Sequence, residues 1–193
     1  MRSLCVFCGS SAGNDPAFAC AAQAVGLEIV ARGWSLVYGG GATGLMGVVA
    51  DTVLAAGGEV IGVLPRGLAR KELLHAGVAR MHLVDSMHER KQLMAELSDG
   101  FLALPGGLGT FEELCEILTW SQLGIHAKPV ALLDVARYYE PFRRLLDRAT
   151  ELGFIKTKYR GLLLEGDLPA PLLDRMAAWS PPPIERWMDR TAT

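Results

Sequence analysis

One stretch decides the fold of this chain: Phe101-Leu102-Ala103-Leu104-Pro105-Gly106-Gly107-Leu108-Gly109-Thr110-Phe111-Glu112-Glu113. Its pattern is that of a buried strand, a glycine turn and the first turn of a helix. Gly106, Gly107 and Gly109 have no Cβ, so a ligand can approach the backbone closely. The helix start adds unpaired N–H groups, including that of Leu108, and the positive end of its dipole, and the Thr110 hydroxyl is a further donor. The stretch therefore predicts a phosphate-binding site.

Two carboxylates, Glu112 and Glu113, follow directly in the new helix. A carboxylate at this position suits the helix dipole but would repel a bound phosphate, unless it faced another part of the ligand. We therefore expect a phosphate site with an acid beside it.

Length and composition indicate an ordinary globular protein. The chain has 193 residues, of which 50% are hydrophobic and 21% charged, with a net charge of −2. We expect one nucleotide-binding domain over residues 1–180, followed by a proline-rich tail over 181–193. The basic clusters are too short to follow a nucleic-acid backbone, so no nucleic-acid partner is expected.

The chain has no sequence feature of membrane insertion or secretion. No apolar segment reaches the roughly 20 residues of a membrane span, and the N-terminus does not resemble a signal peptide. We therefore expect a cytoplasmic protein with no membrane partner, in which the four scattered cysteines are core thiols. Cys5 and Cys8 have the spacing of a metal or redox pair, but no second pair matches them, so no metal site is predicted.

Short apolar runs alternate with helical patterns along the chain. The expected strands are 3–7, 35–38, 59–64, 80–84, 100–104, 129–133 and, at an edge, 161–164. The expected helices are 16–32, 44–56, 87–98, 109–123, 138–153 and 169–179. Strands that are apolar on both faces, alternating with helices, predict an α/β, doubly wound (Rossmann-like) parallel sheet with helices on both faces. Such folds bind ligands beyond the carboxyl ends of their strands.

Two further turns rich in glycine or serine follow predicted strands, at residues 9–13 and 39–47. They bring Ser10, Gly40 and Gly41 to the same sheet edge as the stretch 101–113. Gly39, Gly41 and Gly44 fit the dinucleotide pattern GxGxxG, although the acid expected about 20 residues later would be Glu59, at the start of a strand. Dinucleotide binding, tight helix–strand contact without a ligand, and contact with a smaller nucleotide all remain open.

Basic residues also occur at a predicted helix start, in Met87-His88-Glu89-Arg90-Lys91. Cations there oppose the helix dipole, so they indicate either a solvated helix face or an anionic partner. Arginine has the planar fork that matches a phosphate or a carboxylate. The histidines show no metal-ligand spacing, and no role is assigned to them.

Several segments together resemble the LOG ("lonely guy") family over roughly residues 4–155. These segments are Gly9-Ser10-Ser11, Tyr38-Gly39-Gly40-Gly41-x-x-Gly44-Leu45-Met46-Gly47, Met87-His88-x-Arg90-Lys91, Pro105-Gly106-Gly107-x-Gly109-Thr110-x-x-Glu113 and Gln122-Leu123-Gly124-Ile125-His126-x-Lys128-Pro129-Val130. The loop over residues 66–77 does not match the family pattern closely. The resemblance implies a cytokinin riboside 5′-monophosphate phosphoribohydrolase, which cleaves an N6-modified AMP into free base and ribose 5-phosphate.

The resemblance also implies roles for individual residues. Glu113 matches the catalytic acid of the family and Arg90 the catalytic arginine. Lys91, Glu72 and Thr119 match substrate contacts, together with the phosphate-binding glycines. The resemblance further implies a homodimer, no cofactor, and a small nucleoside monophosphate as the partner.

Two other functions stay open at this point. One is an AMP nucleosidase with little preference for an N6 group, and the other is a non-catalytic nucleotide or cofactor carrier on the same fold. The label lysine decarboxylase, which members of this family often carry, is not favoured, because no lysine here is marked out for a Schiff base with pyridoxal phosphate.

Overall fold

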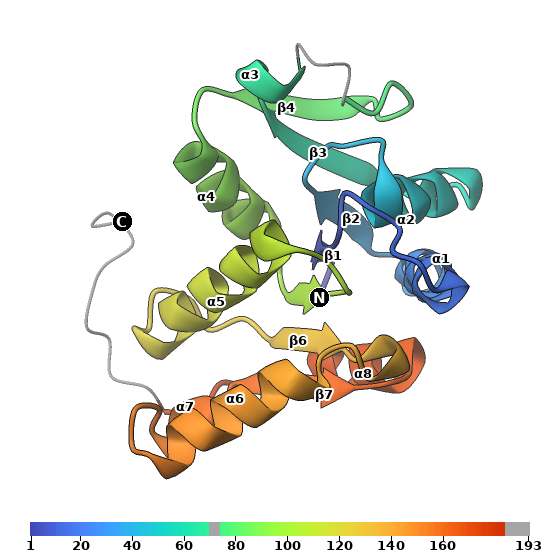
Figure 1. Cartoon of the computed structure of the whole chain (residues 1–193). Helices are drawn as coiled ribbons and strands as arrows, with labels where there is room; N and C mark the ends of the chain where they lie inside the picture. Colours follow the sequence, from blue (N-terminus) through green and yellow to red (C-terminus); the bar gives the residue numbers. More distant parts are fainter. Residues whose placement is uncertain (70–73, 184–193) are drawn as a thin grey trace.

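The computed structural model describes residues 1–69 and 74–183 of the chain. It contains a seven-stranded sheet in the order β4-β3-β2-β1-β5-β6-β7. Every neighbouring pair of strands is parallel. The strand order reverses beside β1, whose two neighbours are β2 and β5, and Figure 1 shows β1 at the middle of the molecule. A doubly wound parallel sheet, the predicted fold class, is confirmed.

The strands and helices alternate along the sequence. The strands are β1 (Ser3–Phe7), β2 (Ser35–Tyr38), β3 (Val60–Pro65), β4 (Arg80–Val84), β5 (Phe101–Ala103), β6 (Val130–Leu133) and β7 (Leu163–Gly166). The helices are α1 (Pro16–Ala31), α2 (Gly44–Ala55), α3 (Arg66–Ala69), α4 (Met87–Leu97), α5 (Leu108–Gln122), the 3₁₀ turn η1 (Val135–Arg137), α6 (Glu140–Glu151), α7 (Thr157–Arg160) and α8 (Pro169–Ala177). No helix among the described residues is long and apolar enough to cross a bilayer.

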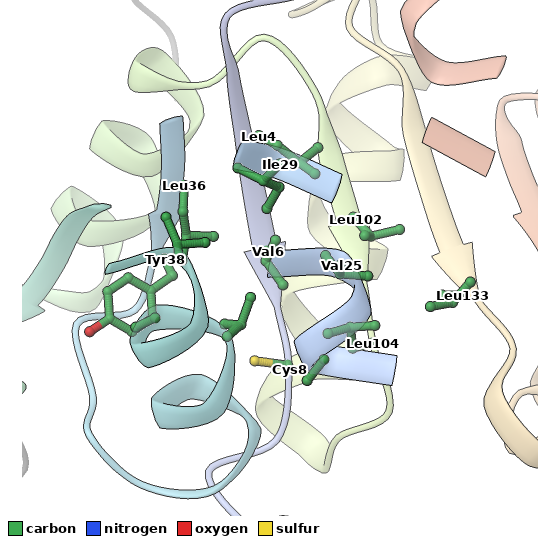
Figure 2. Close-up of a cluster of buried hydrophobic side chains, with 14 of the residues drawn as sticks. Leu4, Val6, Cys8, Val25, Ile29, Leu36, Tyr38, Leu102, Leu104 and Leu133 are labelled. Atoms are coloured by element: carbon green, nitrogen blue, oxygen red, sulfur yellow. The ribbon is translucent and has the colours of Figure 1, made fainter. Parts of the chain in front are cut away.

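Two hydrophobic layers cover the two faces of the sheet. Alternate residues of β1 point to opposite faces, so Leu4 and Val6 belong to one layer and Cys5 and Phe7 to the other. The first layer is completed by α1, α2 and α8, and the second by α4, α5 and α6. Figure 2 shows Leu4 and Val6 beside side chains of α1 in the first layer. Burial on both faces explains why the central strands read as unbroken apolar runs.

The predicted strands and helices differ from the structure mainly at their ends. Pro65 was expected to stop β3 but is its last residue, and α3 follows it directly. The helix expected over 138–153 is shorter, because α6 runs from Glu140 to Glu151, and the 3₁₀ turn η1 before it was not predicted. The edge strand β7 lies two residues later than expected, and the short helices α3 and α7 were not predicted.

The four cysteines were expected in the core, and this is right for only two of them. Cys5 and Cys8 are buried, but they belong to opposite layers of the sheet. Cys20 and Cys115 are exposed, and all four thiols are free. A helical residue just outside the apolar stripe is exposed whatever its type, which is why residue type alone misplaced these two.

The turn between β6 and α6 contains the two non-glycine residues with positive φ in the described chain, Ala136 at 51° and Arg137 at 59°. Left-handed backbone brings the Cβ of an L-residue close to the following carbonyl oxygen, so both positions are strained. The turn is held by a hydrogen bond from the Tyr139 N–H to the Asp134 side chain (2.7 Å) and by one from the Tyr138 N–H to the Val135 carbonyl (3.0 Å).

We expect Arg137→Gly to raise the free energy of unfolding by about 0.5–1 kcal/mol, because glycine adopts positive φ without the Cβ clash. The melting temperature should rise by about 1–4 °C. Arg137→Ala is the matched control. It also removes the exposed ion pair with Glu140 but keeps the Cβ, and it should change stability by less than about 0.5 kcal/mol. Equal melting temperatures for the two variants would show that the turn is not strained.

Candidate functional site

A cleft of about 610 Å³ lies where the loops after β1, β2 and β5 meet. These loops follow the carboxyl ends of adjacent strands at the point where the strand order reverses, which is where doubly wound folds bind ligands. The lining residues are Cys8, Gly9, Ser10, Gly39, Gly41, Thr43, Met46, Leu64, Leu68, Met87, Arg90, Gly107, Leu108, Gly109, Thr110, Glu112 and Glu113.

Two helices, α2 and α5, begin at this cleft with no side chain capping their first N–H groups. By contrast, α1 is capped by the Asp15 carboxylate and α4 by the Ser86 hydroxyl. Uncapped N–H groups and the positive end of a helix dipole favour an anion. The cleft is therefore suited to a phosphate at the start of α5.

In the glycine turn before α5, Gly106 is too crowded to be replaced by a larger residue, whereas Gly107 and Gly109 are not. A Cβ on Gly106 would lie 2.1 Å from the Thr110 Oγ1 atom and 2.8 Å from the Gly9 nitrogen. A Cβ on Gly107 or Gly109 would meet no atom within 4 Å, so these glycines leave open space on the ligand side. Gly106 thus joins the loops after β1 and β5, while the next glycines keep the approach to the backbone clear.

A buried ion pair lies in the same cleft. The Arg90 Nη1 atom of α4 is 2.6 Å from the Glu113 Oε1 atom of α5, and the two side chains are only 10% and 11% exposed. The Arg90 Nε–H also donates to the Val63 carbonyl of β3 (3.2 Å). The Arg90 guanidinium is therefore held in place by α4, α5 and β3. Its ion pair in turn holds the Glu113 carboxylate in one position.

Burial raises the pKa of Glu113, because the charged form loses its water, while the nearby Arg90 guanidinium opposes this shift. The net direction is upward. Burial also raises the pKa of the neighbouring Cys5 and Cys8 thiols, and the Glu113 charge adds to the shift. These thiols therefore stay protonated and unreactive, and Glu113 is a buried carboxyl of the cleft whose pKa is shifted upward.

Gly39, the first residue after β2, makes room for the arginine. A Cβ at this position would lie 2.2 Å from the Arg90 Nη2 atom. The next residues of this loop are held by an antiparallel bridge between Gly41 and Leu74 and by a hydrogen bond from the His75 N–H to the Gly40 carbonyl (3.0 Å). None of the three readings of this glycine-rich turn included the contact that the structure shows, which is between Gly39 and the Arg90 side chain.

Most of the predicted site residues meet in the cleft. Ser10, Gly41, Arg90, Gly107, Leu108, Gly109, Thr110 and Glu113 line it. Gly40 lies beside Gly41 in the same loop, and Gly106 lines a neighbouring cavity that shares Gly107 with the cleft.

Two predicted substrate contacts lie elsewhere, and a third cannot be placed. The Lys91 Nζ atom is 2.6 Å from a Glu112 oxygen and 2.9 Å from a Glu116 oxygen, so its charge is paired with α5. Thr119 lies two turns along α5 from Glu112, where its hydroxyl donates to the Cys115 carbonyl (2.8 Å) and lines a separate groove. Glu72 lies outside the described residues.

Sequence reasoning missed the apolar wall of the cleft and the backbone partner of Arg90. The wall is formed by Met46, Leu64, Leu68 and Met87. It gives the cleft a hydrophobic side opposite in character to the polar glycine turns, as is usual for sites that bind a flat organic group. Met87 is an apolar residue at a predicted helix start, which the sequence alone could have marked. In the structure its side chain is 46% exposed. No sequence signal points to the Val63 carbonyl.

The fold and the cleft define a class: a Rossmann-like α/β protein with an uncapped helix start and a buried acid in one cleft. A family model described as "Possible lysine decarboxylase" matches residues 46–176. "Probable cytokinin riboside 5′-monophosphate phosphoribohydrolase LOGL1" of Oryza sativa subsp. japonica is 50% identical over 92% of this chain and 79% of its own length. "Cytokinin riboside 5′-monophosphate phosphoribohydrolase LOG1" of Arabidopsis thaliana is 45% identical over 93% and 84%. The chain belongs to the LOG family.

Solved structures with the same fold are more distant in sequence. A molybdenum cofactor binding protein from Rippkaea orientalis has a TM-score of 0.69 and 22% identity over 92% of this chain and 96% of its own. The molybdenum cofactor carrier protein from Chlamydomonas reinhardtii has the same TM-score and identity, over 92% and 99%. At this identity the likeness concerns the fold alone.

We expect Glu113 to titrate above 4.5, the usual pKa of glutamate, in the ligand-free protein, because burial outweighs the guanidinium. Carbon-13 NMR of protein with labelled glutamate side chains measures this directly, and the spectrum of Glu113→Gln assigns the resonance. Titration at or below 4.5 would mean that the ion pair dominates instead.

Gly39→Ala should displace the Arg90 guanidinium, because the added Cβ would overlap its Nη2 atom. We expect a loss of about 1–3 kcal/mol in stability from overpacking and a further rise in the Glu113 pKa as its partner moves away. Gly161→Ala is the control, since its Cβ would have no contact closer than 3.8 Å. Thermal unfolding and the same NMR titration compare the two variants, and identical behaviour would contradict the assigned role of Gly39.

Proposed function

We propose that this protein hydrolyses the N-glycosidic bond of an N6-modified adenosine 5′-monophosphate, releasing free base and ribose 5-phosphate. Relatives with 45–50% identity over more than nine tenths of this chain carry the name of that activity. The observation that carries the proposal is the buried Arg90–Glu113 pair in the same cleft as the uncapped start of α5.

The chemistry needs a phosphate anchor and a carboxylate at a fixed separation along one nucleotide. The amides from Gly107 to Thr110 hold the 5′-phosphate, so that binding energy remote from the reacting carbon orients the ribose. Glu113 lies one turn further along α5 and faces the ribose. The phosphate and the carboxylate then contact different parts of the ligand and do not repel each other at close range.

Bond cleavage places positive charge on the ribose ring as the base leaves with the glycosidic electron pair. An ionised Glu113 stabilises this charge, directs a water molecule to the ribose carbon and takes one proton from that water as the new C–O bond forms. The departing base takes up one proton from solvent, so that one water is consumed overall. Arg90 holds the carboxylate in position. Its guanidinium is always charged, so it serves as a fixed donor and not as a proton source. The apolar wall, with Met46 and Met87, suits the base and its N6 group.

Lysine decarboxylation does not fit Lys91, the lysine that follows Arg90 in α4. A Schiff-base lysine needs a lowered pKa. Burial would lower the pKa of Lys91, but its hydrogen bonds to Glu112 and Glu116 outweigh burial and raise it. Lys91 therefore remains a charged ammonium, which can support the site electrostatically across α4 and α5.

We also propose that the protein is a cytoplasmic homodimer. A reducing compartment agrees with four free cysteines, two of which are exposed. A groove formed by α5, α6 and α7, lined by Leu118, Thr119, Phe142 and Ile155 among others, offers an apolar surface for a second copy. Thr119 would contact substrate only in such an assembly, because in one chain it lies outside the cleft.

Glu113→Gln should lower kcat by about 100- to 10,000-fold on isopentenyladenosine 5′-monophosphate. The amide keeps the size of the side chain but cannot stabilise the ribose cation or activate water. Free base is measured by chromatography, with AMP as a parallel substrate. Glu96→Gln, an exposed residue of α4, is the control for the same change of charge. In the wild type, kcat/KM should fall with decreasing pH as Glu113 of the free enzyme becomes protonated, at a pH above 4.5.

The same assay separates the competing functions. Equal rates on AMP and on the N6-modified nucleotide would indicate an AMP nucleosidase. Tight nucleotide binding with no free base from either substrate, in wild type and Glu113→Gln alike, would indicate a carrier and would refute the hydrolase proposal.

A further inference from the structure

Adjacent tyrosines, Tyr138 and Tyr139, hold the glycine turn of the site from behind. The Tyr139 hydroxyl donates to the Leu104 carbonyl (2.7 Å), and the Tyr138 hydroxyl donates to the Gly106 carbonyl (2.5 Å). Between them, the Pro105 carbonyl accepts from the Gly9 N–H (3.0 Å). Three consecutive carbonyls of the turn are therefore each held by a donor from another part of the chain.

Holding a carbonyl also sets the direction of the next amide. The peptide group is planar and trans, so the N–H of a residue points opposite to the carbonyl of the residue before it. Tyr138 lines the neighbouring cavity and not the cleft, while Gly107 lines both. Because the Gly106 carbonyl is drawn toward Tyr138, the Gly107 N–H is turned away from it, toward the cleft. Donation to the carbonyl also polarises that N–H.

The Tyr138 ring is itself fixed by aromatic contacts with two helices that begin near the site. Its centroid lies 5.9 Å from that of Phe18 on α1 and 6.3 Å from that of Phe111 on α5. The two left-handed residues Ala136 and Arg137 come immediately before it. Backbone strain of this kind persists only where surrounding contacts enforce it. Here the strained turn places Tyr138 and Tyr139 where their hydroxyls reach the glycine loop.

We propose that Tyr138 is a positioning residue for phosphate recognition, acting through the Gly106 carbonyl to aim the Gly107 N–H at the substrate phosphate. This inference rests on the proposed function, because it assumes a phosphate at the start of α5. Tyr139 differs in kind. The Leu104 carbonyl that it holds precedes Pro105, which has no N–H, so Tyr139 stabilises the turn without aiming an amide.

The test compares Tyr138→Phe with Tyr139→Phe. The control is Ser35→Ala, which removes a hydroxyl that donates to Glu59 at the amino end of β2, away from the cleft. Calorimetry measures the Kd of ribose 5-phosphate and of inorganic phosphate. Tyr138→Phe should weaken both by about fivefold, the effect of one hydrogen bond. It should raise KM for the nucleotide by a similar factor and change kcat by less than about twofold. Tyr139→Phe should lower the melting temperature but leave both Kd values near those of the wild type.

Several results would overturn the inference. Wild-type Kd values in Tyr138→Phe would show that the hydroxyl does not tune phosphate binding. Equal weakening in Tyr138→Phe and Tyr139→Phe would show a general loosening of the turn instead of control of one amide. A wild-type protein that bound neither phosphate probe would contradict the proposed function itself, and this inference with it.

Discussion

The ion pair between Arg90 and Glu113 fixes how α4, α5 and β3 meet at the cleft. Each charge loses water on burial, so such a pair adds little to stability overall, although removing one partner leaves the other uncompensated at a cost of about 3–5 kcal/mol. The pair is kept only if α4, α5 and β3 stay in register, because Arg90 also needs the Val63 carbonyl. Residue 39 is a glycine for the same reason, because a Cβ there would overlap the Arg90 guanidinium in its paired position.

Charge is distributed unevenly in the cleft. Among the described residues that line it, Arg90 is the only cation, and its charge is matched by Glu113. A phosphate bound there as proposed would be recognised by backbone dipoles, which are fixed in direction and need no side-chain rearrangement. A site built in this way depends on the exact course of the main chain, and this is why residues that touch only carbonyls, such as Tyr138 and the Gly9 amide, matter to it.

Much of this could be predicted from the sequence, because apolar periodicity and glycine turns are local signals. The strands, the doubly wound class and the glycine turn at Gly106 before α5 follow from them. The pairing of Arg90 with Glu113 followed only from the family resemblance, since no local rule joins two helices. Lys91 was predicted as a ligand contact but is paired with Glu112 and Glu116, because its direction depends on how α4 and α5 pack. Tyr138 acts through a backbone carbonyl, which has no sequence signature.

The central position of β1 has a consequence for how the molecule is assembled. Cys5 of β1 pairs with Phe101 of β5, so the two sides of the crevice belong to segments made far apart in time on the ribosome. A nascent chain that ends before β5 leaves one edge of β1 unpaired and carries the Arg90 guanidinium without the Glu113 carboxylate. Long-range parallel pairing of this kind forms slowly. The crevice therefore cannot close until β5 and α5 have been made, and a nucleotide bound as proposed would stabilise only chains that have passed that step.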